Sequence, residues 1–253
     1  MSNDDELDIS RLTLDDIPVT LTKRELYGGA IILSVPTHWR DVSQVRQVPD
    51  HQEVFQDCTI ADDTSNSSSS DKKPSSQILP LGGCMIVEIL ERQNEISDED
   101  AASFFFHDLA EANRGGDDDD DDDGDVNEGD FKLHYTHVWS VGRKEGIPEG
   151  KTAMDQNNII PKLSTRAKAC SCIGNQKVGP LRNQRNIEKG KASKIRIELC
   201  AVRLEAVQTD LLLSLTVPIV SDKMSSRNQN NCHSDLFKSI LASLEIVNWS
   251  LFA

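Results

Sequence analysis

Four strand-like segments follow one another in the second half of the chain, and no helical pattern separates them. FKLHYTHVWSV (131–141) and KIRIELCAVRL (194–204) alternate apolar and polar residues, which is the period of a half-buried strand. ACSCIGNQKV (169–178) is a weaker strand, and TDLLLSLTVP (209–218) is a strongly apolar one that ends in proline. Parallel strands need long crossovers, so these segments are expected to pair mainly antiparallel.

The first of these segments also predicts one face of the sheet. An unbroken alternation would place six side chains on the same, apolar face. They are Phe131, Leu133, Tyr135, His137, Trp139 and Val141. A histidine in that position is predicted to be a core residue and not a metal ligand.

Two further strands are predicted in the first half of the chain. ELYGGAIILSVP (25–36) places a Gly-Gly turn before a β-branched apolar run that ends at a proline. CMIVEILE (84–91) is apolar on both faces, which is typical of a strand in the centre of a sheet.

Helical spacing of apolar residues occurs in two places. SDEDAASFFFHDLAEAN (97–113) is predicted to be an amphipathic helix, with Ser97 and Asp100 at the spacing of a capping box. HSDLFKSILASLEIV (233–247) is predicted to be a second helix that Ser234 caps. The fold class that follows is α+β: a mainly antiparallel sheet with helices packed on both faces, as an α/β/α sandwich.

The remaining composition points to one domain with two insertions. Residues 61–77 are rich in serine, and residues 114–130 contain ten of the acids behind the net charge of −15. Such segments cannot bury a face, so we expect disordered insertions in a single domain spanning 1–253. No secretory signal and no apolar run of the ~20 residues that a membrane span needs is visible, so we expect a cytosolic or nuclear protein that does not bind membranes.

Motifs of catalysis and of cofactor binding are not found in the sequence. It contains no phosphate-binding glycine loop, no nucleophile elbow and no H-E-x-x-H, so we expect neither an enzyme nor a cofactor. The six cysteines lack the spacing of a zinc site, and we expect mostly buried, reduced thiols. The basic stretch 162–196 contains no aromatic residue for base stacking, so we do not expect nucleic-acid binding.

The acidic run partly matches a calcium-binding loop. Six residues fall at positions 1, 3, 5, 6, 8 and 12 of an EF-hand loop: Asp119, Asp121, Asp123, Gly124, Val126 and Asp130. Gly115 and Gly116 lie before the loop and a predicted strand lies after it, so the flanking helices that an EF-hand requires are missing. We therefore favour a solvated acidic loop over a calcium site and expect no bound metal.

Two carboxylates in VPDHQEVF (48–55) are the candidate site. Pro49 sets a turn. If one helical turn follows, Asp50 and Glu53 lie on the same side and form a compact negative patch. In an alternative interpretation, Asp50 caps a helix through the amide of residue 53 and Glu53 returns the bond. The spacing alone leaves both interpretations open.

Several strings occur in an order that resembles a known family. They are YGGAI (27–31), DVSQVRQVPDHQEVF (41–55), MIVEILE (85–91), HDLAEAN (107–113), VRLEAVQTDLLLSLTVP (202–218) and SLFA (250–253). Together they resemble the Ran guanine nucleotide release factor family, nuclear import factors that bind the Ran GTPase.

The resemblance implies a sheet sandwiched by helices, in the fold of the PsbP protein of photosystem II. It also implies that Asp50 and Glu53 belong to an acidic Ran-binding surface. We therefore expect a monomer of the nucleus and cytoplasm that binds Ran and promotes nucleotide release, with other Ran-binding proteins as further candidate partners. The alternative is a non-catalytic acidic scaffold that recruits basic partners through its low-complexity loops.

Overall fold

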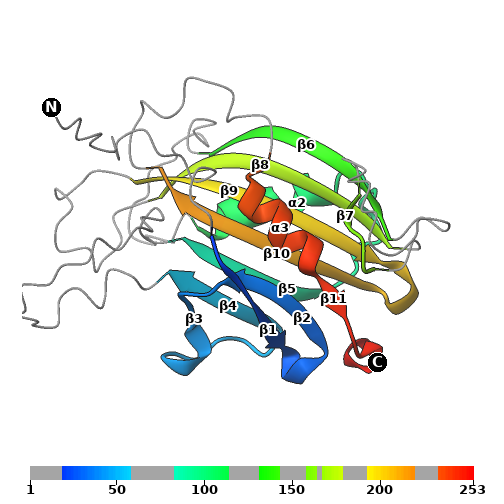
Figure 1. Cartoon of the computed structure of the whole chain (residues 1–253). Coiled ribbons are helices and arrows are strands. Elements are labelled where there is room, and N and C mark those ends of the chain that lie inside the picture. Colours follow the sequence, from blue (N-terminus) through cyan, green and yellow to red (C-terminus); the bar gives the residue numbers. More distant parts are fainter. Residues whose placement is uncertain are drawn as a thin grey trace, which may run out of the picture.

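A computed structural model describes seven segments of the chain (Figure 1): residues 19–57, 83–113, 131–142, 158–163, 167–178, 193–219 and 233–253. The predicted insertions at 61–77 and 114–130 lie outside these segments, as do residues 164–166 and 179–192 of the basic stretch 162–196. The EF-hand interpretation of 119–130 falls outside them too.

Eight strands form the main sheet in the order β3-β4-β5-β10-β9-β8-β6-β7. Among these strands every pairing is antiparallel except that of β6 with β7. Their bounds are β3 Trp39–Asp41, β4 Gln52–Asp57, β5 Cys84–Glu91, β6 Phe131–Val141, β7 Asn158–Ile160, β8 Lys168–Val178, β9 Ser193–Leu204 and β10 Thr209–Pro218. The predicted mainly antiparallel sheet is confirmed.

A second, three-stranded sheet has the order β1-β2-β11. Its strands are β1 Leu21–Leu26, β2 Ile31–Pro36 and β11 Glu245–Ile246. The described helices are α2 Ala101–Ala112 and α3 Asp235–Ser243, with short 3-10 turns η3 Tyr27–Gly29, η4 Val42–Gln44, η5 Glu205–Val207 and η7 Trp249–Phe252. Neither α-helix has the length and apolar character that crossing a bilayer would require.

The two faces of the main sheet are covered differently. α2 packs on one face, where Phe105 and Phe106 meet Leu199 and other side chains of β8, β9 and β10. The opposite face carries the larger core, to which both α3 and the three-stranded sheet contribute. Figure 1 shows α3 in front of the sheet and α2 behind it. A second sheet thus shares a face with α3, an arrangement that differs from helices alone on both sides.

Cysteines join α2 to the sheet beneath it. The amide of Ala102 donates to Cys170 Sγ at 3.2 Å, and Cys172 Sγ donates to the carbonyl of Ala102 at 3.2 Å. Both thiols are buried and free, as is Cys200, and burial raises the pKa of each. The prediction of reduced, buried thiols is confirmed for these three residues.

The predicted face of β6 is wrong, because a β-bulge interrupts the strand. Leu133 pairs with Gly174 but Tyr135 pairs with Ile173, which leaves one extra residue between the two pairs. Since side chains alternate along a strand, one inserted residue moves all later side chains to the other face. Phe131 and Leu133 therefore pack on the α2 side.

After the bulge, Trp139 and Val141 join the larger core on the α3 side. His137 is half-buried there, with its ring 4.2 Å from that of Trp139 and stacked on Tyr135. It therefore lies beside the core and not within it. Burial, and then the charge of His233, lowers its pKa.

The start of α3 agrees with the sequence prediction, and the start of α2 differs from it. The hydroxyl of Ser234 accepts from the amide of Phe237 at 3.2 Å, so the predicted cap of α3 is confirmed. The amide of Asp100 donates to Ser97 Oγ at 3.1 Å, so the pair at capping-box spacing does interact. The helix itself begins only at Ala101, because residues 98–100 form a turn.

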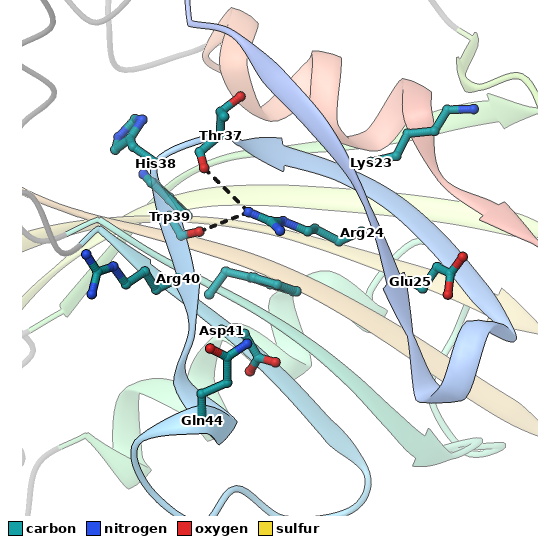
Figure 2. Close-up of a pocket in the computed structure, with 10 residues that line it drawn as sticks. Lys23, Arg24, Glu25, Thr37, His38, Trp39, Arg40, Asp41 and Gln44 are labelled. Carbon is teal, nitrogen blue, oxygen red and sulfur yellow. Dashed lines mark hydrogen bonds between the residues drawn. The ribbon is translucent and has the colours of Figure 1, made fainter.

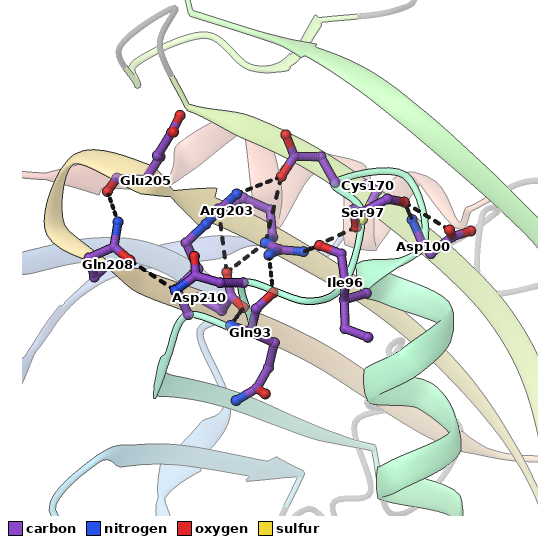
Figure 3. A network of polar contacts seen from close by, with 12 residues as sticks. Gln93, Ile96, Ser97, Asp100, Cys170, Arg203, Glu205, Gln208 and Asp210 are labelled. Carbon is purple, nitrogen blue, oxygen red and sulfur yellow. Dashed lines mark hydrogen bonds and ion pairs between the residues drawn. The ribbon is translucent and has the colours of Figure 1, made fainter.

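A buried ion pair fixes the loop that leads into α2 (Figure 3). Arg203 on β9 and Asp210 on β10 are both 0% exposed, and Arg203 Nε lies 2.8 Å from Asp210 Oδ1. The guanidinium also donates to three carbonyls of the loop after β5: those of Gln93, Ile96 and Ser97. Asp210 Oδ2 accepts from the amide of Gln93 at 3.0 Å. A buried pair of opposite charges on β9 and β10 thus fixes the backbone of the loop to the sheet.

Candidate partner-binding surface

The residues before β4 form a loop and a turn, not a helix. The amide of Gln52 donates to the carbonyl of Pro49 at 2.9 Å, and β4 begins at Gln52. No helical turn brings Asp50 and Glu53 together, so both helix-based interpretations of this string are wrong. The two carboxylates come instead from the turn and from the strand that follows it.

Asp50 is exposed at this turn. Within the described part of the chain, its side chain makes no hydrogen bond or ion pair. A carboxylate without an intramolecular partner has no desolvated contact to give up when another protein approaches. Asp50 is therefore available to a basic partner as it stands.

Glu53 has a structural contact as well as partial exposure. Its Oε1 accepts from the backbone amide of Tyr27 at 2.7 Å, a charge-assisted hydrogen bond. Tyr27 needs this support because it has a φ of +51° and opens a turn in which Gly28 and Gly29 also have positive φ. Such backbone is unfavourable for a residue with a Cβ. Glu53 thus stabilises the β1–β2 turn that the YGG string encodes.

The phenol of Tyr27 joins the same turn to the main sheet. Its hydroxyl lies 3.0 Å from the carbonyl of His51 and 2.9 Å from that of Val87 on β5. Burial, and then the charges of Glu53 and Glu88, raise the pKa of Tyr27 far above its ordinary value. A neutral phenol therefore remains a hydrogen-bond donor at any physiological pH and holds the turn at 51 against β5.

Two more carboxylates lie around this turn. Glu88 Oε1 on β5 accepts from Gln52 Nε2 at 2.7 Å and lies 3.4 Å from His51 Nε2. Glu25 is exposed at the end of β1, beside Gly29. We call Glu25, Asp50, Glu53 and Glu88 the acidic rim. It is a locally negative surface whose backbone is fixed on three strands.

An open depression of about 730 Å³ lies between β1 and β3 (Figure 2). Charged side chains of both signs line it, among them Lys23, Arg24, Glu25, Arg40 and Asp41. Arg24 donates to the carbonyls of Thr37 and Trp39, at 3.4 Å each. Those contacts connect β1 to the β2–β3 connection, and the mixture of charges selects no ligand class. The depression is therefore not the candidate site.

A Ser–His–Glu chain, which the sequence analysis did not find, lies inside the molecule. His233 Nε2 is 2.7 Å from Ser171 Oγ, and Nδ1 is 3.0 Å from Glu198 Oε2. Trp139 Nε1 also donates to Ser171 Oγ at 2.6 Å. All three members are at most 2% exposed, so no substrate reaches the serine. This Ser–His–Glu network connects the start of α3 to β8 and β9, and its role is structural. Its three residues lie on segments far apart in the sequence, so no sequence motif indicates it.

The pKa of Glu198 is the outcome of opposing effects. Burial alone would raise it, but the hydrogen bond with His233, the charge of Arg196 and the amide of Ser234 outweigh burial. The pKa therefore lies below its ordinary value. A carboxylate with a lowered folded-state pKa stabilises the fold above its unfolded pKa, about 4.3, and this contribution is lost as the pH falls through the folded value.

We expect Glu198→Gln to be less stable than the wild type at pH 7, by about 1–3 kcal/mol. The difference should shrink as the pH falls below about 4.3, since the carboxylate of the unfolded wild-type chain then takes up a proton. Urea unfolding of both proteins at pH 7 and pH 3.5 measures it. Glu205→Gln, a change at an exposed carboxylate, is the matched control. A difference between wild type and Glu198→Gln that stays constant with pH would contradict the assignment.

Metal chemistry has no candidate in the described segments. They contain no group of three or more His, Cys, Asp or Glu side chains placed to hold an ion. Glu53 and Glu88 of the acidic rim instead have donors of the protein itself nearby. The arrangement suits recognition of a charged protein surface.

Comparison with known proteins identifies the family. A family model described as "Ran-interacting Mog1 protein" matches residues 24–218. The chain is 25% identical over 234 residues to the Ran guanine nucleotide release factor of Danio rerio, covering 90% of this chain and 98% of that protein. It is 24% identical over 236 residues to the nuclear import protein MOG1 of Saccharomyces cerevisiae, covering 90% and 84%.

A solved structure supports the fold. The Ran-binding protein Mog1p of Saccharomyces cerevisiae matches with a TM-score of 0.55 and 18% identity, over 93% of this chain and 100% of that one. The family match extends from Arg24 on β1 to the end of β10 and so includes the turn that carries Asp50 and Glu53. The chain belongs to the Ran-interacting Mog1 protein family.

Proposed function

We propose that this protein binds the Ran GTPase through its acidic rim and promotes release of the bound guanine nucleotide, in support of nuclear import. Family membership and the names of the relatives support the partner and the process. The observation that carries the choice of surface is Asp50, exposed and unpaired among the described residues, on a turn that Tyr27 fastens to the sheet.

The electrostatics of the rim account for selective binding. A GTPase holds its nucleotide phosphates with a lysine, backbone amides and Mg²⁺. Carboxylates on a fixed backbone pair with basic side chains of the partner at little conformational cost. If the rim pairs best with basic groups in a conformation that holds nucleotide poorly, binding favours that conformation. By linkage, the nucleotide then binds more weakly by the same factor.

Glu53 has a double role in this proposal. One oxygen supports the Tyr27 amide, and the half-buried carboxylate keeps its charge at the rim. Asp50 supplies the charge that faces outward. Asp50 lies on a turn and Glu53 on a strand, and not on one face of a helix as predicted. The proposed site therefore has another geometry but the same two residues.

Release of labelled GTP from purified Ran tests the proposal. We expect the release rate to rise with the concentration of this protein and to saturate. A release rate that is independent of its concentration, measured with protein that binds Ran, would reduce the function to binding alone. Ran that shows no binding at all would overturn the proposal.

Further properties belong to the same proposal. We propose a monomer with a single domain over 1–253, present in nucleus and cytoplasm, without a cofactor or catalytic residues and without affinity for nucleic acid or membranes. A common core beneath both sheets supports the single domain. The PsbP-like sandwich and the binding of other Ran-binding proteins are part of the proposal as well.

Deleting residues 61–77 and 114–130 separates the regulator from the scaffold. We expect the deleted protein to keep its affinity for Ran within about twofold, because the rim and its supporting contacts lie outside both segments. Titration calorimetry against Ran measures it. An affinity lowered tenfold or more in a folded protein would favour the scaffold.

A further inference from the structure

Two large apolar side chains, two positions apart in the sequence, are exposed in the segment after α3. Val247 is 55% exposed and Trp249 is 41% exposed. Single exposed apolar residues are ordinary. An exposed tryptophan two positions after an exposed valine is less ordinary. Tryptophan is among the residues most often found at the energetic centre of protein interfaces.

Hydrogen bonds fix the backbone of this segment. The amides of Val247 and Asn248 both donate to the carbonyl of Ala30, at 2.9 Å and 3.1 Å. Asn248 Oδ1 then accepts from the amide and the hydroxyl of Ser250, at 3.0 Å and 2.8 Å, and so caps η7. The tryptophan therefore starts from an ordered backbone, which lowers the entropy lost on binding.

Packing holds the inner side of the same segment. Leu251 and Phe252 pack against the larger core, and the Phe252 ring lies 5.9 Å from that of Trp249. The string SLFA, which is part of the family resemblance, thus has a structural role on its inner side. Trp249 and Val247 are the exposed large apolar side chains of the segment and are available to a partner.

The apolar pair adjoins the acidic rim through one turn. Ala30, which accepts the two amides, closes the turn that Tyr27 opens, with its own amide 3.3 Å from the Tyr27 carbonyl. Tyr27 in turn donates to Glu53, and Glu25 lies beside Gly29. Figure 1 shows the red C-terminal segment at the same end of the molecule as the blue turn between β1 and β2.

We infer that Val247 and Trp249 form the apolar half of the partner-binding surface, and that the acidic rim forms its charged half. This rests on the proposed function, since the same partner contacts both halves. The fitting partner is a protein that presents an apolar patch beside lysine or arginine side chains. Specific interfaces combine an apolar patch with polar and charged surroundings, and both kinds of surface are present here.

The two halves have different kinetic signatures. Rim charges attract a basic partner over a distance, so they act mainly on the association rate, and their effect weakens with salt. A buried aromatic side chain acts after encounter, so its removal mainly raises the dissociation rate. The inference therefore predicts which rate constant each substitution changes.

Surface plasmon resonance with purified Ran tests the inference. We expect Trp249→Ala to weaken binding about tenfold or more, mostly through faster dissociation and nearly independently of salt. Val247→Ser should weaken it about threefold. Phe104→Ala is the matched control, because Phe104 is an aromatic residue of similar exposure (39%) on α2, on the opposite side of the main sheet. Its affinity should equal that of the wild type.

The outcomes separate this inference from the proposed function. If the wild type and Phe104→Ala bind, Asp50→Lys binds weakly, and Trp249→Ala and Val247→Ser bind as the wild type does, the inference is wrong and the proposed function stands. If the wild type does not bind Ran, the proposed function fails and the inference fails with it. Should Trp249→Ala not fold, as judged by circular dichroism and thermal unfolding, Val247→Ser and Trp249→Phe decide. If Val247→Ser leaves the dissociation rate unchanged and Trp249→Phe weakens binding, an apolar contact is contradicted.

Discussion

Replacing Asp50 by lysine together with Glu53 by glutamine is expected to weaken binding to Ran about a hundredfold. The pair changes the rim by three charge units and places a cation where we propose that a basic partner docks. Close charge pairs across an interface contribute about 1.5–7 kcal/mol in measured cases, and a hundredfold change corresponds to ~2.8 kcal/mol. Glutamine is chosen at position 53 because its amide oxygen can still accept from the Tyr27 amide.

A matched pair on α2 controls for the change in net charge. Asp108 and Glu111 are exposed and have the same spacing along the chain as Asp50 and Glu53. Asp108→Lys with Glu111→Gln should therefore leave the affinity within about twofold. Titration at low and at physiological salt measures both double variants. A folded rim variant that binds Ran as tightly as the wild type would show that the partner docks elsewhere.

Arg203→Met is expected to have the largest effect on stability, about 3–5 kcal/mol of unfolding free energy. The substitution leaves Asp210 buried beside an apolar side chain and removes the donors to the carbonyls of Gln93, Ile96 and Ser97. Breaking one partner of a buried ion pair costs this much because the remaining charge is not compensated. Arg92 Nη1 lies 4.0 Å from Asp210 Oδ1, so its charge offsets only part of the loss and it does not replace the 2.8 Å contact.

Urea unfolding of three proteins isolates this effect. The double variant Arg203→Met with Asp210→Leu should recover a large part of the loss, since apolar replacements of both partners leave no buried charge. A loss below about 1 kcal/mol in the single variant would mean that the loop before α2 does not depend on the pair. Equal losses in the single and double variants would mean that packing, not charge, dominates there.

The sequence predicted the elements that their own residues determine. β8, β9 and β10 follow from apolar runs without helices between them, and α3 follows from its stripe and its cap at Ser234. Short strands such as β3 and β4 were not predicted. Trp39–Asp41 has three residues and Gln52–Asp57 is largely polar, so neither shows a clear period.

Features that depend on contacts between distant segments could not be predicted. The bulge between Leu133 and Tyr135 is visible only as a shift in pairing with β8, because the alternation in the sequence is unbroken. The support of Tyr27 by Glu53 joins residues 26 positions apart. Pro49 correctly indicated a turn, but what followed it was a strand that pairs with β5, and tertiary pairing decided the conformation of Gln52 onward.

The resemblance alone proposed Asp50 and Glu53 as site residues, and the structure adds their surroundings. Glu88 and Tyr27 carry no signal as neighbours of Asp50, since β5 and the β1–β2 turn reach this place only in the folded chain. Trp249 stands just before the string SLFA that was part of the resemblance, and only its exposure distinguishes it from the core residues after it.

The most direct test of a rim that favours nucleotide-poor Ran is a comparison of two equilibrium affinities. The dissociation constant of this protein is measured for nucleotide-free Ran and for GTP-loaded Ran under the same salt conditions. We expect binding to nucleotide-free Ran to be at least about fivefold tighter, and the ratio of the two affinities to be near one for Asp50→Lys with Glu53→Gln. Equal affinities of the wild type for both forms of Ran would contradict it.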